Sequence, residues 1–68
     1  MTGAELKAIR QGLGLTLSGF GAAIGYKGNK NTLSVAIRRF ESGARPIPHW
    51  TVRRIMAVVQ GNSVANNG

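Results

Sequence analysis

The chain has 68 residues and no cysteine, so it forms at most one small domain, without a disulfide or a thiolate metal site. Nine Lys and Arg side chains oppose two acids, which gives a net charge of +7 at pH 7. This balance favours a polyanionic partner, of which nucleic acid is the first candidate and an anionic membrane the second. The alternative is a cationic surface that only keeps the protein soluble.

Two short helices are expected first. Thr2 and Glu5 have the spacing of a capping box, and the helix that follows Thr2 should end near Gly12. Thr16 is a suitable N-cap for a second helix, from Leu17 to Ile24. Glycines inside this second helix weaken it, but they also allow another helix to approach closely.

The third predicted helix, from about residue 31 to 42, has two different sides. One side is apolar at helical spacing and should face the core. The other side carries polar and cationic groups without an acid, which suits a helix placed against nucleic acid. Either Asn31 or Thr32 should cap the helix, and Gly43 should end it. The apolar stripe is Leu33, Ala36, Ile37 and Phe40.

A fourth helix should begin near Pro48 and end near Gly61, because proline suits a first turn and glycine follows a last one. The four helices together predict one all-α domain over residues 1–61. Residues 62–68 are polar and lack periodicity, so we expect a flexible tail there. The predicted inner stripe of the fourth helix is Val52, Ile55, Met56 and Val59.

Four segments form a pattern that recurs in a known family: residues 6–10 (LKAIR), 14–16 (GLT), 22–25 (AAIG) and 39–43 (RFESG). Over residues 4–60 the chain resembles the lambda-repressor-like (Cro-type, XRE) helix-turn-helix family. With residues 45–48 (RPIP) it is similar to small phage autorepressors of the anti-CRISPR-associated kind. The resemblance implies a domain of four or five helices. Its third helix would enter the major groove of double-stranded operator DNA as part of a homodimeric transcriptional repressor on an inverted repeat.

The chain departs from this family in two places. Leu17 stands where the family has a glutamine that contacts phosphate, so that side-chain contact is lost. The turn before the third helix is longer than in the family, and the added residues include Lys27 and Lys30. We infer that this basic turn also approaches DNA, so the register of the base contacts cannot be copied from the family.

Four residues on the third helix are the predicted base contacts. Arg38 has the guanidinium fork that matches guanine, and its alternatives are a phosphate contact or a solvated side chain. Asn31 is equally suited to capping, and Val35 either contacts a thymine methyl group or is simply exposed. The predicted set is Asn31, Ser34, Val35 and Arg38.

Other charged residues are assigned to DNA phosphates or to the fold. The resemblance implies an ion pair between Arg10 of the first helix and Glu41 of the third. Arg10 is therefore not counted as a DNA contact. A charged residue in a loop is often just solvated, which is the alternative for Lys27. The predicted phosphate contacts are Lys27, Lys30, Thr32, Arg39 and Arg45.

Trp50 falls opposite the apolar stripe of the fourth helix, and an outward tryptophan on a small domain predicts a partner surface. A homodimer with Trp50, Arg54 and Ala57 at its interface is the natural partner, because repressors of this type read two half-sites. In the alternative, the helix is rotated and Trp50 completes the core.

No enzyme activity, cofactor, metal site or small-molecule substrate is expected, because His49 is the only histidine and Glu5 and Glu41 lie far apart. Neither a signal peptide nor a bilayer-spanning stretch is evident, so we expect a cytoplasmic protein that does not act at a membrane. Two alternative functions stay open. One is a membrane-active cationic peptide, and the other is an antitoxin or adaptor that binds both a protein and DNA.

Overall fold

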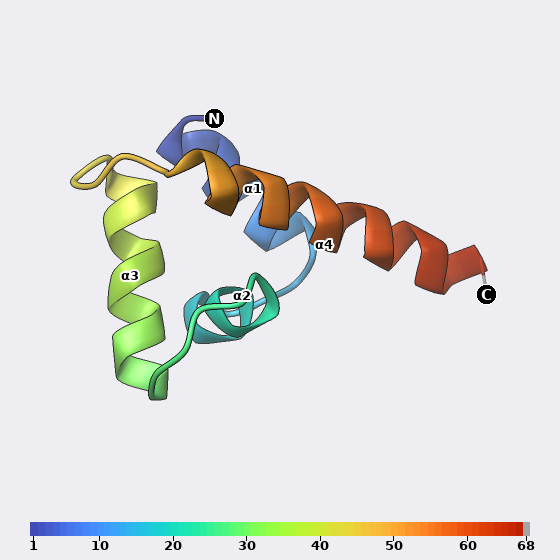
Figure 1. Cartoon of the computed structure of the whole chain (residues 1–68), viewed down its shortest axis with the longest axis horizontal. Coiled ribbons are helices and arrows are strands. Elements are labelled where there is room, and N and C mark those ends of the chain that lie inside the picture. The colour runs from blue at the N-terminus through green and yellow to red at the C-terminus, as the bar shows by residue number, and fades with distance from the viewer. Residues whose placement is uncertain (68) are drawn as a thin grey trace.

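The computed structural model describes the backbone of residues 1–67 and the side chains of residues 1–61. Over residues 1–67 it contains four helices and no strand (Figure 1). The prediction of an all-α chain is confirmed. None of these helices combines the length and the apolarity that a membrane span requires. The helices are α1 (Gly3–Gly12), α2 (Leu17–Ala23), α3 (Lys30–Ser42) and α4 (His49–Asn67).

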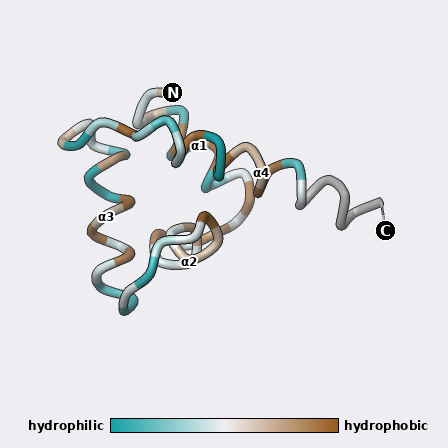
Figure 2. Tube along the Cα trace, in the orientation of Figure 1, coloured by the Kyte–Doolittle hydropathy of each residue, from teal (hydrophilic) through white to brown (hydrophobic). Residues whose placement is uncertain are grey.

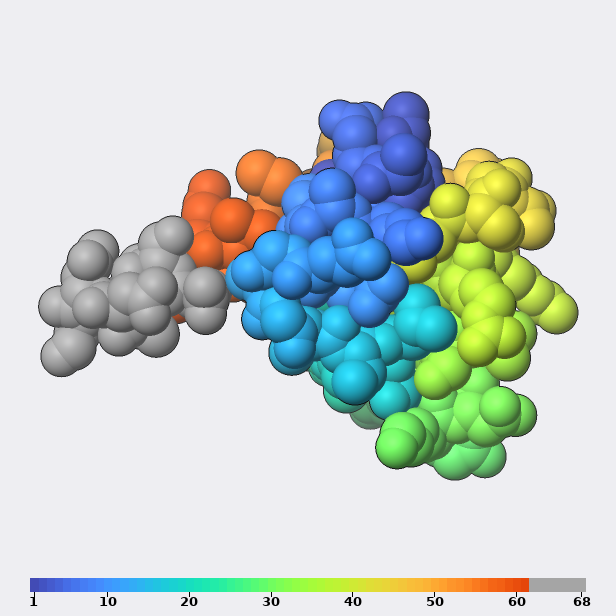
Figure 3. Space-filling view, turned by 180° about the vertical axis from the view of Figure 1, so that it is seen from behind, coloured from blue at the N-terminus to red at the C-terminus, as the bar shows by residue number. Residues whose placement is uncertain are grey.

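The helices surround one apolar core to which each of them contributes. In Figure 1, α3 stands at one side, α4 crosses the top and α2 lies below α4. Seen from behind, α1 and the turn after it cover the middle of the molecule (Figure 3). Phe20 of α2 and Phe40 of α3 are the largest fully buried side chains, so two aromatic rings anchor the packing. The buried cluster is Leu6, Phe20, Ile24, Ile37, Phe40 and Ile55.

α1 begins and ends as the sequence predicts. The Thr2 hydroxyl accepts the N–H of Glu5 at 3.1 Å, and the Glu5 carboxylate accepts the N–H of Thr2 at 2.8 Å, which completes the capping box. Leu6 is buried, while Ile9 and Leu13 pack against the core from the same side of α1. These three side chains join α1 and the residue after it to the core.

α2 packs closely on α3 because Gly21 has no side chain. A Cβ placed on Gly21 would lie 3.2 Å from the Cβ of Leu33 and 3.4 Å from Cγ1 of Ile37, both on α3. The predicted close approach at a glycine of this helix is confirmed. Thr16 caps α2 as expected, and the helix ends at Ala23, one residue before the predicted end.

The start of α3 corrects the predicted cap. Neither Asn31 nor Thr32 is the N-cap: the side-chain oxygen of Asn29 accepts the N–H of Thr32 at 2.8 Å, and the helix begins at Lys30. An asparagine oxygen reaches the backbone N–H three residues onward, and both Asn29 and Asn31 are candidates by residue type. Gly43 ends the helix in the left-handed region, with φ of 81°, as predicted.

α4 turns a different stripe to the core from the predicted one. Ile55 is buried as expected, but Met56 is 44% exposed and Val52 and Val59 are only partly buried. Thr51 is fully buried instead, because its hydroxyl shares a hydrogen bond of 2.9 Å with the hydroxyl of Tyr26. A threonine whose hydroxyl is hydrogen-bonded can occupy a core position, although its hydropathy does not predict burial.

The end of α4 also differs from the prediction. The helix continues past Gly61 to Asn67, because glycine lowers helix stability without preventing helical geometry. The side chains of residues 62–67 and the whole of Gly68 lie outside the described part of the chain. The expected flexibility of residues 62–68 therefore stays a prediction.

Candidate nucleic-acid interface

α3 turns its apolar stripe inward and a polar side outward. Figure 2 shows the hydrophobic residues of α3 on the side toward α2 and α4. A helix turns about 100° per residue, so Asn31, Val35 and Ser42 form the middle of the outer side. Arg38 lies on one flank of this row and Arg39 on the other. All of these side chains are exposed except that of Val35, which is half-buried.

A groove of about 310 Å³ follows the Arg39 flank of the outer side. It brings together residues from both predicted classes: Asn31 and Val35, expected to contact bases, and Arg39 and Arg45, expected to contact phosphates. Ala36 was predicted to lie in the core, but it is only partly buried and lines this groove. The lining residues are Asn31, Thr32, Val35, Ala36, Arg39 and Arg45.

The opposite flank holds the other two predicted base contacts. Ser34, Arg38 and Glu41 recur at helical spacing, so they share this flank. Ser34 is half-buried and Arg38 is exposed, and neither lines the groove. Two of the four predicted base contacts, Asn31 and Val35, line the groove, and the other two, Ser34 and Arg38, do not.

Arg45 is held beside α3 although it belongs to the loop after this helix. Gly43 reverses the chain, and the backbone N–H of Arg45 then donates to the carbonyl oxygen of Arg39 at 3.3 Å. The guanidinium carbon of Arg45 lies 5.9 Å from the centroid of the Phe40 ring, within cation–π range. These contacts place two arginines along one groove, as a pair of adjacent phosphate contacts requires.

The basic turn leads directly into the first turn of α3. Lys27 lies in the turn and Lys30 is the first residue of the helix, and both side chains are exposed. The backbone N–H of Tyr26 donates to the carbonyl of Gly21 at 3.0 Å, which ties the start of the turn to α2. Neither lysine lines the groove, so their assignment to phosphates stays a prediction.

Both acidic side chains are engaged within the fold. Nε of Arg10 donates to the Glu41 carboxylate at 2.6 Å, so the predicted ion pair is confirmed. The backbone N–H of Thr2, and after it the Thr2 hydroxyl, holds the pKa of the Glu5 carboxyl below its ordinary value of 4.5. Glu41 borders the outer side of α3 beside Arg38, but its carboxylate is paired with Arg10, and Glu5 lies on α1.

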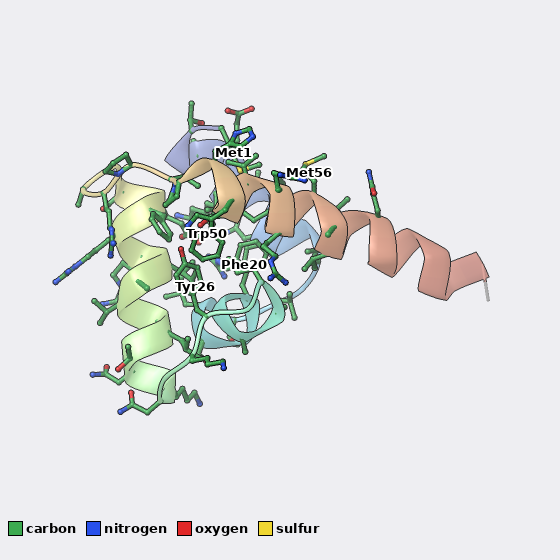
Figure 4. All side chains as sticks on the ribbon, viewed as in Figure 1. Met1, Phe20, Tyr26, Trp50 and Met56 are labelled. Carbon is green, nitrogen blue, oxygen red and sulfur yellow. The ribbon has the colours of Figure 1, made fainter. Side chains whose placement is uncertain are left out.

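A second exposed surface lies on α4. Trp50 is 50% exposed, and its ring leans on the Tyr26 ring with the centroids 5.2 Å apart (Figure 4). One part of the indole is thus packed and another faces solvent, a result between the two readings of the sequence. Arg54 and Ala57 are exposed on the same stripe of the helix, as a dimer interface requires. That interface stays a prediction.

Trp50 also borders a hollow of about 320 Å³, whose other lining residues are Arg53 and Arg54. The predicted site omits Arg53 and Tyr26. The i, i+3, i+4 spacing of Trp50, Arg53 and Arg54 was a sufficient signal for Arg53. No sequence spacing relates Tyr26 to Trp50, because only the tertiary fold brings the turn after α2 against α4.

The described side chains offer no group of three or more His, Cys, Asp or Glu that could hold a metal ion. The candidate surfaces are therefore defined by arginine, lysine, amide and aromatic side chains. No protein-family model, no curated protein and no solved structure matches this chain.

Proposed function

We propose that α2, the turn after it and α3 form a helix-turn-helix unit, and that the protein binds double-stranded DNA sequence-specifically as a transcriptional repressor. The observation that carries this proposal is the outer side of α3, which is cationic and rich in hydrogen-bonding groups. Glu41, the one acid of α3, is bound to Arg10 instead of facing outward. A helix with such a side fits the width of the major groove.

The side chains on the outer side of α3 can be divided into base contacts and phosphate contacts. Asn31 can pair with adenine and Arg38 with guanine, while Val35 offers an apolar contact to a thymine methyl group. Arg39 and Arg45 would hold phosphates on the groove flank, with Thr32, Lys27 and Lys30 near the N-terminal end of the helix. Phosphate contacts fix the position of α3, and base contacts then discriminate between sequences.

The packing of α2 supports the same function. Because Gly21 seats α2 against Leu33 and Ile37, α2 lies behind α3 and leaves the outer side of α3 uncovered. In helix-turn-helix proteins the first helix of the unit holds the second against DNA in this way. Repression would follow when a homodimer on an inverted repeat occludes a promoter in the cytoplasm, a step that rests on analogy with the resembling family.

The test is a binding titration with the DNA just upstream of the gene, inspected for an inverted repeat, against a scrambled duplex of equal length and composition. We expect tighter binding to the upstream duplex. Arg38→Ala should remove this preference while circular dichroism still shows a helical fold. Equal affinity for both duplexes, at every salt concentration, would contradict sequence-specific recognition.

The alternative of a membrane-active peptide predicts a different behaviour in water. The core residues of the described chain are buried against one another, so their apolar surface is not offered to lipid. We expect a helical circular dichroism spectrum in lipid-free buffer. A coil that becomes helical only on anionic vesicles would favour the membrane-active alternative.

A further inference from the structure

The hollow beside Trp50 is built as a firm platform. The Tyr26 ring lies between the Trp50 ring, at 5.2 Å, and the Phe40 ring, at 6.0 Å. The Tyr26 hydroxyl shares a hydrogen bond with Thr51, so the Tyr26 ring is fixed by this bond as well as by its contacts with the two other rings. Figure 4 shows Trp50 and Tyr26 side by side in the space framed by α2, α3 and α4.

Two cations border this platform without an acid of their own. Arg53 and Arg54 are exposed and line the hollow with Trp50. A Cβ placed on Gly25 would lie 3.9 Å from Nη1 of Arg54, so this guanidinium lies over the turn after α2. The acidic side chains of the whole chain are Glu5, in the capping box, and Glu41, bound to Arg10. Neither of these glutamates is therefore paired with Arg53 or Arg54.

We propose that the hollow of Trp50, Arg53 and Arg54 docks an acidic segment of another protein. An apolar side chain of that segment would rest on the exposed part of the indole, and two carboxylates would accept hydrogen bonds from the guanidinium groups. Tryptophan and arginine are the residues most enriched at the energetic centres of protein interfaces. The proposal does not depend on DNA binding by α3.

Charge argues against a second copy of this chain as the occupant, so the homodimer of the proposed function would associate through a face other than the hollow. A symmetric pair would place the arginines of one copy near those of the other. The partner copy would bring the same two acids, each already engaged within its own fold. Like charges placed together across an interface oppose association, so complementarity selects a partner richer in acid than this chain.

Nucleic acid is the other polyanion to consider. Phe40 belongs to the inner side of α3, and the row of rings from Phe40 through Tyr26 to Trp50 leads away from the outer side of that helix. The hollow is separate from the groove beside α3, because the two share no lining residue. Single strands are held by successive aromatic platforms, whereas the hollow offers one indole.

Trp50 is the only tryptophan, so its fluorescence reports directly on the hollow. The probe is a short glutamate-rich peptide with a central leucine, titrated into the full chain, and the matched control peptide has glutamine for every glutamate. We expect a saturable change in Trp50 emission with the glutamate peptide and little change with the glutamine peptide. The double variant R53Q/R54Q should weaken binding about tenfold or more, since hydrogen bonds to charged groups are lost.

The matched control is R38Q/R39Q, which removes the same charge from α3 and should weaken peptide binding less than about threefold. Equal losses in both double variants would show diffuse attraction and overturn the site. A single-stranded oligonucleotide that binds the hollow more tightly than the peptide would overturn it in favour of nucleic acid. A chain that is dimeric by sedimentation and becomes monomeric in R53Q/R54Q would overturn it in favour of self-association.

Discussion

Arg10 of α1 and Glu41 of α3 form an ion pair that both joins two helices and decides the charge of a surface. The Nε–carboxylate distance is 2.6 Å, and the two side chains are 14% and 10% exposed. Nη1 of Arg10 also donates to the carbonyl of Leu15 at 3.0 Å, which fixes the chain just before α2. One arginine thereby connects α1, the entry to α2 and the end of α3.

Arg10→Gln should lower the free energy of unfolding by about 3 kcal/mol, because it leaves a mostly buried carboxylate without its partner. Lys7→Gln removes the same charge from an exposed position of α1 and should change the free energy of unfolding by less than about 0.5 kcal/mol. Urea denaturation followed by circular dichroism measures both. The double variant R10M/E41M should recover most of the loss, and a double variant as unstable as R10Q would contradict this explanation.

Gly21→Val should destabilise the protein by about 1–3 kcal/mol, because the added carbons meet Leu33 and Ile37 where a Cβ is already at 3.2 Å. Gly12→Ala is the matched control in the last turn of α1, where a Cβ meets nothing within 4 Å. It should stabilise the helix by roughly 0.5–1 kcal/mol. Thermal melts test the pair, and equal effects of the two changes would refute the close contact of α2 with α3.

Asn29→Ala should cost about 1 kcal/mol of stability, because it removes the acceptor that the Thr32 N–H uses at 2.8 Å. Asn31→Ala should leave the melting temperature almost unchanged but reduce discrimination between the upstream and scrambled duplexes. The two asparagines thus separate capping from base contact. A melting temperature that falls equally in both variants would place Asn31 in the cap after all.

Arg39 and Arg45 should contribute mainly to the salt dependence of DNA binding. Changing either to Gln is expected to weaken binding to both duplexes alike and to lower the slope of log K against log salt by about one. Arg38→Gln should instead act chiefly on the preferred duplex. Titrations at several salt concentrations distinguish these effects, and a loss confined to the preferred duplex in R39Q would assign Arg39 to base contact.

Stability should fall when acid protonates Glu5. Its carboxyl has a folded pKa below its ordinary value of 4.5, so the ionised form is favoured by folding. The contribution is present above pH 4.5 and is lost as the pH falls through the lowered value. Glu5→Gln keeps an acceptor for the Thr2 N–H but cannot titrate, so its melting temperature should depend less on pH in this range. Identical pH profiles would exclude a role for this carboxyl.

The sequence alone predicted the elements whose signals are local. The capping box of Thr2 and Glu5, the cap at Thr16, the end of α3 at Gly43 and the buried stripe of α3 apart from Ala36 depend on neighbours within a few residues. The pairing of Arg10 with Glu41 was predicted through the family resemblance, since no local rule connects residues so far apart in the chain. The proposed base and phosphate contacts came from residue type and helical spacing, and they stay predictions.

The tertiary structure decided what depends on the angle at which helices meet. It buried Thr51 instead of Met56, because the Tyr26 hydroxyl satisfies the threonine at that position. It joined Arg45 to Arg39 in one groove and left Arg38 on the other flank. Helical periodicity defines which residues share a side but not how that side is rotated toward the core. That rotation follows from packing between segments distant in sequence, which also created the hollow beside Trp50.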